Sequence, residues 1–249
     1  MAKLNNNTSI YIQSRGITPE DDYCWLKIED NNQVTAIPEI LNRLSLVSLI
    51  DSQMFSLVLA YQQPYFILLV TGLEATPPEL DFMGRKIRNS LLWISPEEAQ
   101  IRSLTVAALE GQLANALEEI IYRDNNLNNS FRIDTDQLEK LTDLVKLNYY
   151  NNSYNPAQLG NNNETLRQQL ALEIQTNCLP TNRQLLIVIT SIKSAIDLER
   201  LKVWRGLSNR ISSDELTPTT ATEKKTLVNT AVIATATAIT IFLIISMLF

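Results

Sequence analysis

The feature that most constrains this chain is its last segment, because residues 226–249 contain no charged side chain. At about 1.5 Å per residue, such a segment would span about 36 Å as a helix, and the hydrocarbon core of a bilayer is about 30 Å thick. The alternative is a buried helix at the end of a soluble core, but such a helix rarely lacks a polar face along its whole length. We therefore expect a single transmembrane helix over residues 226–249, with the lipid bilayer as a partner.

The flanking charges predict the orientation of this span. Lys224 and Lys225 stand directly before it. Because basic residues collect on the cytoplasmic side of a membrane, the preceding domain is expected in the cytoplasm. The first residues of the chain contain no apolar run of the kind that makes a signal peptide. The prediction is a single-pass, tail-anchored membrane protein whose N-terminal domain is cytoplasmic.

The predicted span is not uniform along its length. Thr230, Ala234 and Ala238 are small residues spaced four apart, so they would share one face of a helix. In lipid, small residues allow helix backbones to approach closely. These three residues predict self-association through the span. A plain anchor, in which they make no specific contact, is the alternative.

Composition narrows the range of chemistry that the chain can perform. With 45% hydrophobic and 19% charged residues, it has the composition of an ordinary globular protein, and its net charge of −6 argues against a nucleic-acid partner. The chain has no histidine, which excludes Ser-His-Asp and Cys-His catalysis and metal sites with histidine ligands. Cys24 and Cys178 lack the spacing of a zinc site and are expected to pack as small apolar residues. No cofactor and no metal site are predicted.

The pattern of apolar residues predicts a mixed α/β domain, in which a mixed sheet packs with helices. Residues 1–211 would form this domain, with two subdomains as an option if it divides near residues 124–134. A polar linker over 212–225 would follow. The expected strands are 9–13, 23–28, 55–61, 65–73, 86–94 and 185–190; the expected helices are 38–50, 96–123, 134–147, 164–175 and 197–207.

Ser95, Pro96 and Glu98 resemble a helix capping box. In that arrangement the Ser95 hydroxyl would accept from the backbone N–H of Glu98, and the Glu98 side chain would reach back. Near the predicted membrane, Trp204 with Arg200 and Arg205 is expected to serve packing and contact with lipid headgroups.

The best polar cluster for binding is formed by Arg85, Lys86, Arg88 and Ser90. On a strand, Lys86, Arg88 and Ser90 would share one face, and Arg85 would point the other way. Such a face could bind an anion or an acidic partner. The competing interpretation is a solvated strand edge protected by charge. A second, weaker cluster of Asp21, Asp22, Glu29 and Asp30 could hold Mg²⁺, although loop acids are usually only solvated.

Three functions are compatible with these observations. The leading hypothesis is a tail-anchored, non-enzymatic protein whose cytosolic domain binds a protein partner or small signal, with the span localising or oligomerising it. The second is a membrane effector whose associated spans perturb or permeabilise the bilayer. The third is a membrane-tethered, metal-dependent hydrolase that uses carboxylates. The sequence contains no Walker loop, G-x-G-x-x-G, G-x-S-x-G or H-E-x-x-H motif, which favours the non-enzymatic interpretation.

Overall fold

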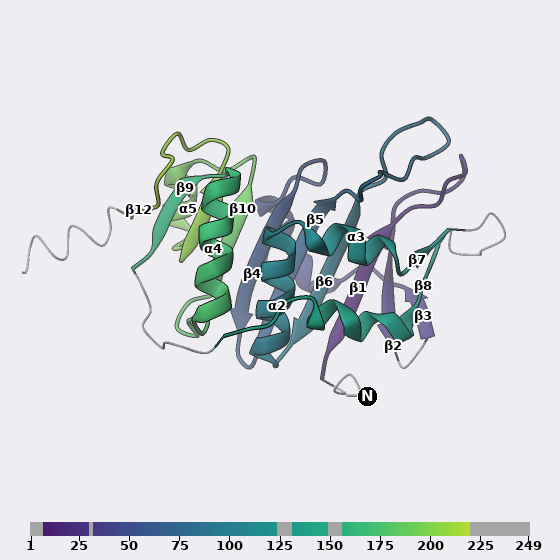
Figure 1. Ribbon diagram of the computed structural model, residues 1–249, viewed down its shortest axis with the longest axis horizontal. Helices are drawn as coiled ribbons and strands as arrows, with labels where there is room; N and C mark the ends of the chain where they lie inside the picture. Colours follow the sequence, from purple (N-terminus) through teal and green to yellow (C-terminus); the bar gives the residue numbers. More distant parts are fainter. Residues whose placement is uncertain (1–6, 30–31, 124–130, 149–155, 220–249) are drawn as a thin grey trace, which may run out of the picture.

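The computed structural model describes residues 7–29, 32–123, 131–148 and 156–219. Its backbone is a ten-stranded sheet with the order β12-β9-β11-β10-β4-β5-β6-β1-β2-β3, beside a two-stranded ribbon of β7 and β8 (Figure 1). The predicted mixed α/β fold is therefore confirmed. The strands are β1 Ser9–Ser14, β2 Cys24–Glu29, β3 Asn32–Thr35, β4 Ser56–Gln62, β5 Tyr65–Leu73, β6 Asn89–Ser95, β7 Ile121–Tyr122, β8 Arg132–Ile133, β9 Gln158–Asn161, β10 Leu185–Thr190, β11 Arg205–Ser208 and β12 Thr217–Pro218.

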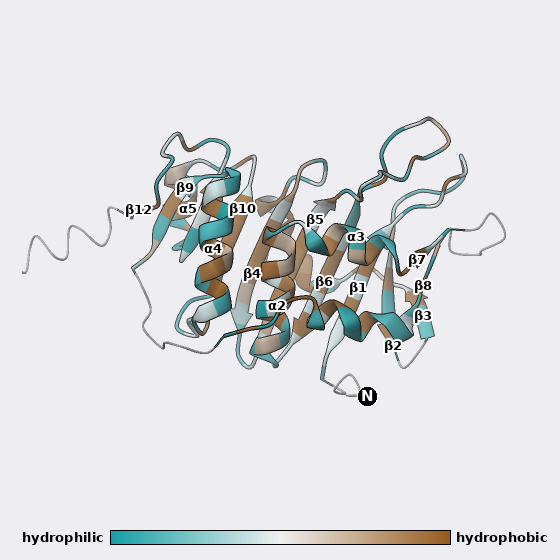
Figure 2. Cartoon of the chain, viewed as in Figure 1, coloured by the Kyte–Doolittle hydropathy of each residue, from teal (hydrophilic) through white to brown (hydrophobic). Residues whose placement is uncertain are grey.

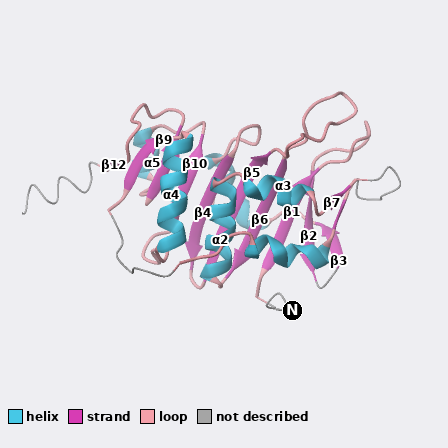
Figure 3. Cartoon of the chain, in the orientation of Figure 1, coloured by secondary structure: helices cyan, strands magenta, loops and turns pink. Residues whose placement is uncertain are grey.

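Helices cover the two faces of the sheet unequally. Apolar residues of α2, α3, α4 and the 3₁₀ helix η2 pack on one face, called the first face, and α1, α5 and the 3₁₀ helix η1 pack on the second face. Figure 3 shows α2, α3 and α4 lying in front of the sheet. The helical segments are α1 Glu39–Arg43, η1 Leu46–Leu49, α2 Glu98–Leu109, α3 Gln112–Glu118, η2 Thr135–Asp143, α4 Glu164–Thr176 and α5 Ala195–Arg200.

The central strands are apolar along nearly their whole length because both of their faces are buried. In β4, Leu57 and Leu59 join the core of the first face, and Val58 and Ala60 join the core of the second face. Strands β5 and β6 follow the same alternation. Figure 2 shows the hydrophobic residues concentrated in these strands and on the helix surfaces turned towards them. Burial on both faces explains why the sequence shows continuous apolar runs here instead of an alternating pattern.

Two strand arrangements meet in the sheet. From β4 to β3 in the sheet order, all neighbours are antiparallel, whereas β9, β11 and β10 are mutually parallel. Helix α4 connects β9 to β10 over the first face, and α5 connects β10 to β11 over the second face.

The registers place Ser14, Leu73, Asn89 and Ser208 at the same end of the sheet, called here the Arg15 end. The opposite end is called the Thr219 end.

Two predicted helices are shorter than expected because the backbone turns into the left-handed region, and a third has a different helix type. Ser45, at φ 54°, separates α1 from η1 within the predicted helix 38–50. Gly111, at φ 77°, interrupts the helix predicted over 96–123 and separates α2 from α3. Residues 134–147 were predicted as an α-helix, but Thr135–Asp143 form a 3₁₀ helix.

The predicted helix 197–207 is wrong in its second half. Helix α5 ends at Arg200, Lys202 takes φ 57°, and the chain continues as the buried strand β11. A Cβ on Gly206 would lie 2.5 Å from Leu159 Cδ2 and 3.0 Å from Leu198 Cδ1, so these two leucine side chains pack directly over the glycine. The apolar spacing that suggested a helix comes instead from residues buried against both faces of the sheet.

The predicted capping box is also wrong. Ser95 is the last residue of β6, and its Oγ accepts from the backbone N–H of Glu97 at 3.1 Å. The Glu98 carboxylate accepts from the backbone N–H of Leu179 at 2.7 Å, and so connects the start of α2 to the segment after α4. Glu98 therefore connects two segments that are far apart in the sequence and does not form a capping box with Ser95.

The sheet continues past residue 211, where the sequence placed the end of the domain. Strand β12 pairs with β9, and Thr219 is buried with its N–H bonded to Ala157 O at 3.1 Å.

No helix in the described ranges is both long and apolar enough to cross a bilayer. The predicted span 226–249, with Thr230, Ala234 and Ala238, and the preceding Lys224 and Lys225 lie outside the described residues.

A buried arginine joins three segments near β12. The Arg205 guanidinium donates to both carboxylate oxygens of Glu173, at 2.7 and 2.6 Å, and to Pro156 O at 2.6 Å. It also lies over the Trp204 ring, 4.2 Å from the centroid. Arg205 and Trp204 are both buried, which contradicts the expectation that they contact lipid headgroups.

Arg205→Ala should lower the free energy of unfolding by about 3 kcal/mol, because it leaves the Glu173 carboxylate largely buried without its partner. Urea denaturation measures the change. Arg210→Ala removes an exposed arginine two residues after β11 and should change the stability by less than about 0.5 kcal/mol. Equal stability of the two variants would show that the Arg205 ion pair contributes nothing to folding.

Candidate functional site

Two loops meet at the Arg15 end: residues 15–23 between β1 and β2, and residues 74–88 between β5 and β6. The second loop begins after a register shift between Val70 and Leu73. Gly72 lies in this irregularity at φ 69°, and a Cβ there would be 2.4 Å from the Met54 backbone. Glycine is therefore required where the chain turns out of the sheet into the 74–88 loop.

Asp81 fixes the conformation of the 74–88 loop. Its Oδ1 accepts from the backbone N–H groups of Met83, at 2.8 Å, and Arg85, at 2.9 Å. Its backbone N–H donates to Arg85 O, and its carbonyl accepts from Gly84, both at 2.9 Å. Met83, Gly84 and Arg85 are thus all held by one residue. The tip is consequently a closed turn whose shape does not depend on its exposed side chains.

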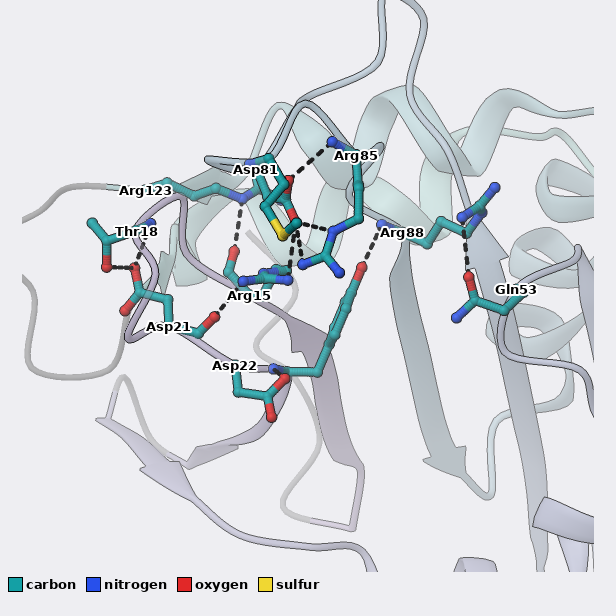
Figure 4. Close-up of polar contacts among 11 residues, drawn as sticks. Arg15, Thr18, Asp21, Asp22, Gln53, Asp81, Arg85, Arg88 and Arg123 are labelled. Carbon is teal, nitrogen blue, oxygen red and sulfur yellow. Dashed lines mark hydrogen bonds and ion pairs between the residues drawn. The ribbon is translucent and has the colours of Figure 1, made fainter.

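Arg15 connects this turn to the body of the domain. Its Nη1 donates to Asp81 Oδ2 at 3.1 Å, and its Nη2 donates to the carbonyl of Asp21 at 2.6 Å (Figure 4). The guanidinium also lies 5.7 Å from the centroid of the Tyr23 ring and 5.9 Å from that of Phe82, within the range of cation–π attraction. Because the Arg15 side chain is only 8% exposed and the Asp81 side chain 2%, water competes little for this ion pair.

A second polar network lies beneath Arg15. Arg123 donates to the carbonyl of Arg15 at 3.1 Å and to Ser14 Oγ at 2.9 Å, and it forms an ion pair with Glu118. Asn89 donates to Glu118 at 2.6 Å and accepts from Ser14 at 2.7 Å. This network connects β1, β6 and α3, so the base of the two loops is fixed by side chains from three elements.

The structure places three of the four predicted site residues together. Arg85, Lys86 and Arg88 lie in the 74–88 loop, before β6 begins at Asn89, so the predicted strand starts later than expected. Ser90 is apart from them: it is buried within β6 and donates to Gln13 at 3.2 Å. The common face expected for Lys86, Arg88 and Ser90 is therefore absent.

Each cation of the loop already has a carboxylate close to it. Arg85 Nε donates to Asp81 Oδ2 at 2.8 Å, and Lys86 Nζ lies 2.5 Å from Glu74. Arg88 Nη2 is 3.7 Å from the same glutamate, and its Nη1 donates to Gln53 at 3.3 Å. Asp81 and Glu74 are each shared by two cations, but the 74–88 loop as a whole holds three acidic and three basic residues. With no net charge, the loop lacks the positive field that would attract a free anion.

The apolar residues of the loop are its most unusual feature. Leu80, Phe82 and Met83 are 47%, 49% and 63% exposed, and they surround the turn that Asp81 closes. We call these three residues the apolar tip. Large side chains exposed singly are common, but three on one fixed turn form a patch that typically marks a binding surface.

The sequence analysis missed Arg15, Asp81 and the apolar tip. A usable signal was present, since Asp81-Phe82-Met83-Gly84 has Asp first and Gly fourth, the preference of a type I turn. The pairing of Arg15 with Asp81 had no comparable signal because the two residues are far apart in the sequence.

The weaker acidic cluster does not assemble in the structure. Asp21 accepts from the Thr18 hydroxyl at 2.7 Å, Asp22 accepts from the N–H of Tyr23 at 2.7 Å, and Glu29 pairs with Lys27 at the other end of β2. Asp30 lies outside the described residues. Where the structure describes the chain, no three acidic or thiol side chains are grouped so that they could hold a metal ion, and Cys24 and Cys178 are not joined.

An open groove of about 770 Å³ lies on the second face, between α1 and strands β1, β2 and β5. Its lining includes Tyr11 and Tyr65, together with Lys27, Arg43 and Glu39. Both charge signs are represented, and Lys27 is already paired with Glu29. The groove therefore does not select one class of ligand as clearly as the apolar tip selects an apolar partner.

Comparison with known proteins leaves this geometry as the basis for any functional argument. No family model, no curated protein and no solved structure matches the chain.

The pH dependence of stability should report on Asp81. Burial would raise the pKa of this carboxyl, but hydrogen bonds from the backbone and side chain of Arg85 and from the backbone of Met83 outweigh it, so the pKa is lowered. The stability that Asp81 contributes is complete above the ordinary aspartate pKa of about 4 and is lost as pH falls through the lowered value.

Asp81→Asn should therefore be clearly less stable than wild type at pH 7, and this difference should shrink when the pH is lowered well below about 4. Urea midpoints of both proteins at the two pH values measure it. Asp214→Asn, a change at an exposed carboxylate, is the control and should show a small difference at both. A constant deficit for Asp81→Asn across this range would show that the charge of Asp81 does not hold the loop.

Proposed function

We propose that this is a tail-anchored, non-enzymatic membrane protein whose α/β domain binds a protein partner through the apolar tip. The observation that carries the proposal is that Leu80, Phe82 and Met83 stand exposed on a turn fixed by Asp81 and Arg15. The partner would cover these apolar side chains, while Arg85 and Lys86 would contact its polar rim.

The fixed turn favours binding because it reduces the entropic cost of association. A loop that is already ordered loses little conformational freedom when a partner covers it. Aromatic residues and methionine are enriched at protein interfaces, and Phe82 and Met83 occupy the centre of the tip. The locally balanced charges of Arg85, Lys86 and Arg88 suit the rim of such an interface better than they suit a free anion site.

The point at which the chain leaves the sheet favours a partner in the aqueous phase. The described chain leaves the sheet at Thr219, whereas the apolar tip lies at the opposite end. Strand β5 alone has nine residues, which corresponds to about 30 Å between the two ends. With residues 226–249 in the bilayer, the apolar tip would point away from the membrane. The proposal includes self-association of the span through Thr230, Ala234 and Ala238.

A photo-crosslinking residue at position 82 of the full chain should capture a protein partner in the native host, and the same residue at position 172 should not. Leu172 is the matched control because it is also exposed, on α4, away from the loop. With the captured partner purified, Phe82→Ser should weaken binding about tenfold or more, whereas Leu172→Ser should leave it unchanged. Equal crosslinking from both positions, or equal affinity of the two variants, would contradict the proposed site.

Deleting residues 226–249 should release the protein from membranes as a folded domain. The physical reason is that this uncharged segment would supply the apolar surface that the bilayer takes up. Resistance of the full chain to alkaline carbonate extraction, and its loss on deletion, is the measurement. A truncated chain that stays carbonate-resistant, or that no longer folds, would remove the anchor from the proposal.

A further inference from the structure

The Thr219 end carries basic side chains beside the point where the chain leaves the domain. Arg183 precedes β10, Arg200 is the last residue of α5, and Lys202 lies between α5 and β11. Leu201, 40% exposed, stands between the last two. We call these four residues the basic patch. Arg200 and Lys202 are exposed and Arg183 is half-buried, and within the described ranges none of the three is part of an ion pair.

Hydrogen bonds connect this patch to the exit point. Thr219 N–H bonds to Ala157 O at 3.1 Å, and the next residue, Gln158, bonds to Trp204 O at 2.9 Å. On the far side of β11, Arg183 Nη1 donates to Lys202 O at 3.4 Å. Strands β12, β9, β11 and β10 are neighbours in this order, so three steps of about 4.8 Å separate the exit from the patch. Along the sheet, the start of β10 is thus displaced by about 15 Å from Thr219.

The length of the remaining chain limits how far this end can be from the predicted span. Seven residues lead from Thr219 to Thr226, and fully extended they would reach at most about 25 Å. With Glu223 before them, Lys224 and Lys225 in this stretch add a net charge of one of the same sign. The basic patch is therefore held near whatever surface the span enters.

We propose that the basic patch rests on the anionic surface of the membrane, with Arg183, Arg200 and Lys202 contacting lipid headgroups and Leu201 entering the interface. This inference rests on the proposed tail anchor. Cytoplasmic leaflets are negatively charged, and basic side chains held near them are attracted within about one Debye length. The turn at Lys202, whose φ of 57° ends α5, presents Leu201 and Lys202 outwards together. With the Thr219 end docked on the membrane, the apolar tip at the opposite end of the sheet faces the aqueous phase.

Hydrogen–deuterium exchange of the full chain in nanodiscs tests the proposal. Peptides covering 181–185 and 199–204 should exchange more slowly in discs containing phosphatidylserine than in phosphatidylcholine discs, and the peptide covering 80–86 should not change. High ionic strength should remove the difference, because the Debye length falls to about 3 Å at 1 M salt. Each cation should shift the balance between docked and undocked domains by about fivefold.

The triple change Arg183→Gln, Arg200→Gln and Lys202→Gln should abolish the protection. The matched control, Lys140→Gln with Lys193→Gln and Arg210→Gln, removes the same charge from positions outside the basic patch and should retain the protection. Equal exchange in both kinds of disc, or loss of protection in the control, would overturn the docking surface while leaving the anchor intact. A full chain that does not stay embedded in the discs would overturn the anchor itself and this inference with it.

Discussion

Burial of β4, β5 and β6 on both faces is the constraint on which the rest of the structure depends. Strands of this kind cannot remain in water, so each face needs its own cover. Helices α2, α3, α4 and η2 provide it on the first face, and α1, η1 and α5 on the second. The helices on the second face are shorter and leave the open groove beside α1. The loops at both ends of the sheet are positioned by this three-layered core.

Buried arginines connect distant segments around that core. Arg15 joins the 74–88 loop to the β1–β2 loop, and Arg205 joins α4, β9 and β11. Arg102 likewise donates to the last carbonyls of α4, at 2.8 and 3.0 Å. Such buried ion pairs and hydrogen bonds add little net stability over apolar packing. Their multiple directed bonds do define one arrangement of the segments, which is what the proposed binding loop at the Arg15 end requires.

The two ends of the sheet differ in chemistry as well as in position. The Arg15 end presents apolar side chains on a fixed turn with locally balanced charges, and the Thr219 end presents basic side chains next to the exit of the chain. The sequence already pointed to residues 85, 86 and 88, and it placed 86 and 88 on a strand face that could bind an anion or an acidic partner or could be a charged strand edge. The carboxylates of Asp81 and Glu74, which come from other parts of the loop, change that interpretation towards a protein partner.

The sequence by itself determined the features that depend on neighbouring residues. Apolar runs defined β4 and β5, helical spacing defined α4, and their combination gave the mixed α/β class, because each reflects local periodicity. The missing histidine restricted the chemistry, and the uncharged stretch 226–249 supports the predicted span. Tertiary structure decided the strand order, the short strands β9, β11 and β12, and the contact of Arg15 with Asp81. These features depend on packing between residues far apart in the chain, and a single sequence carries no local pattern for such pairs.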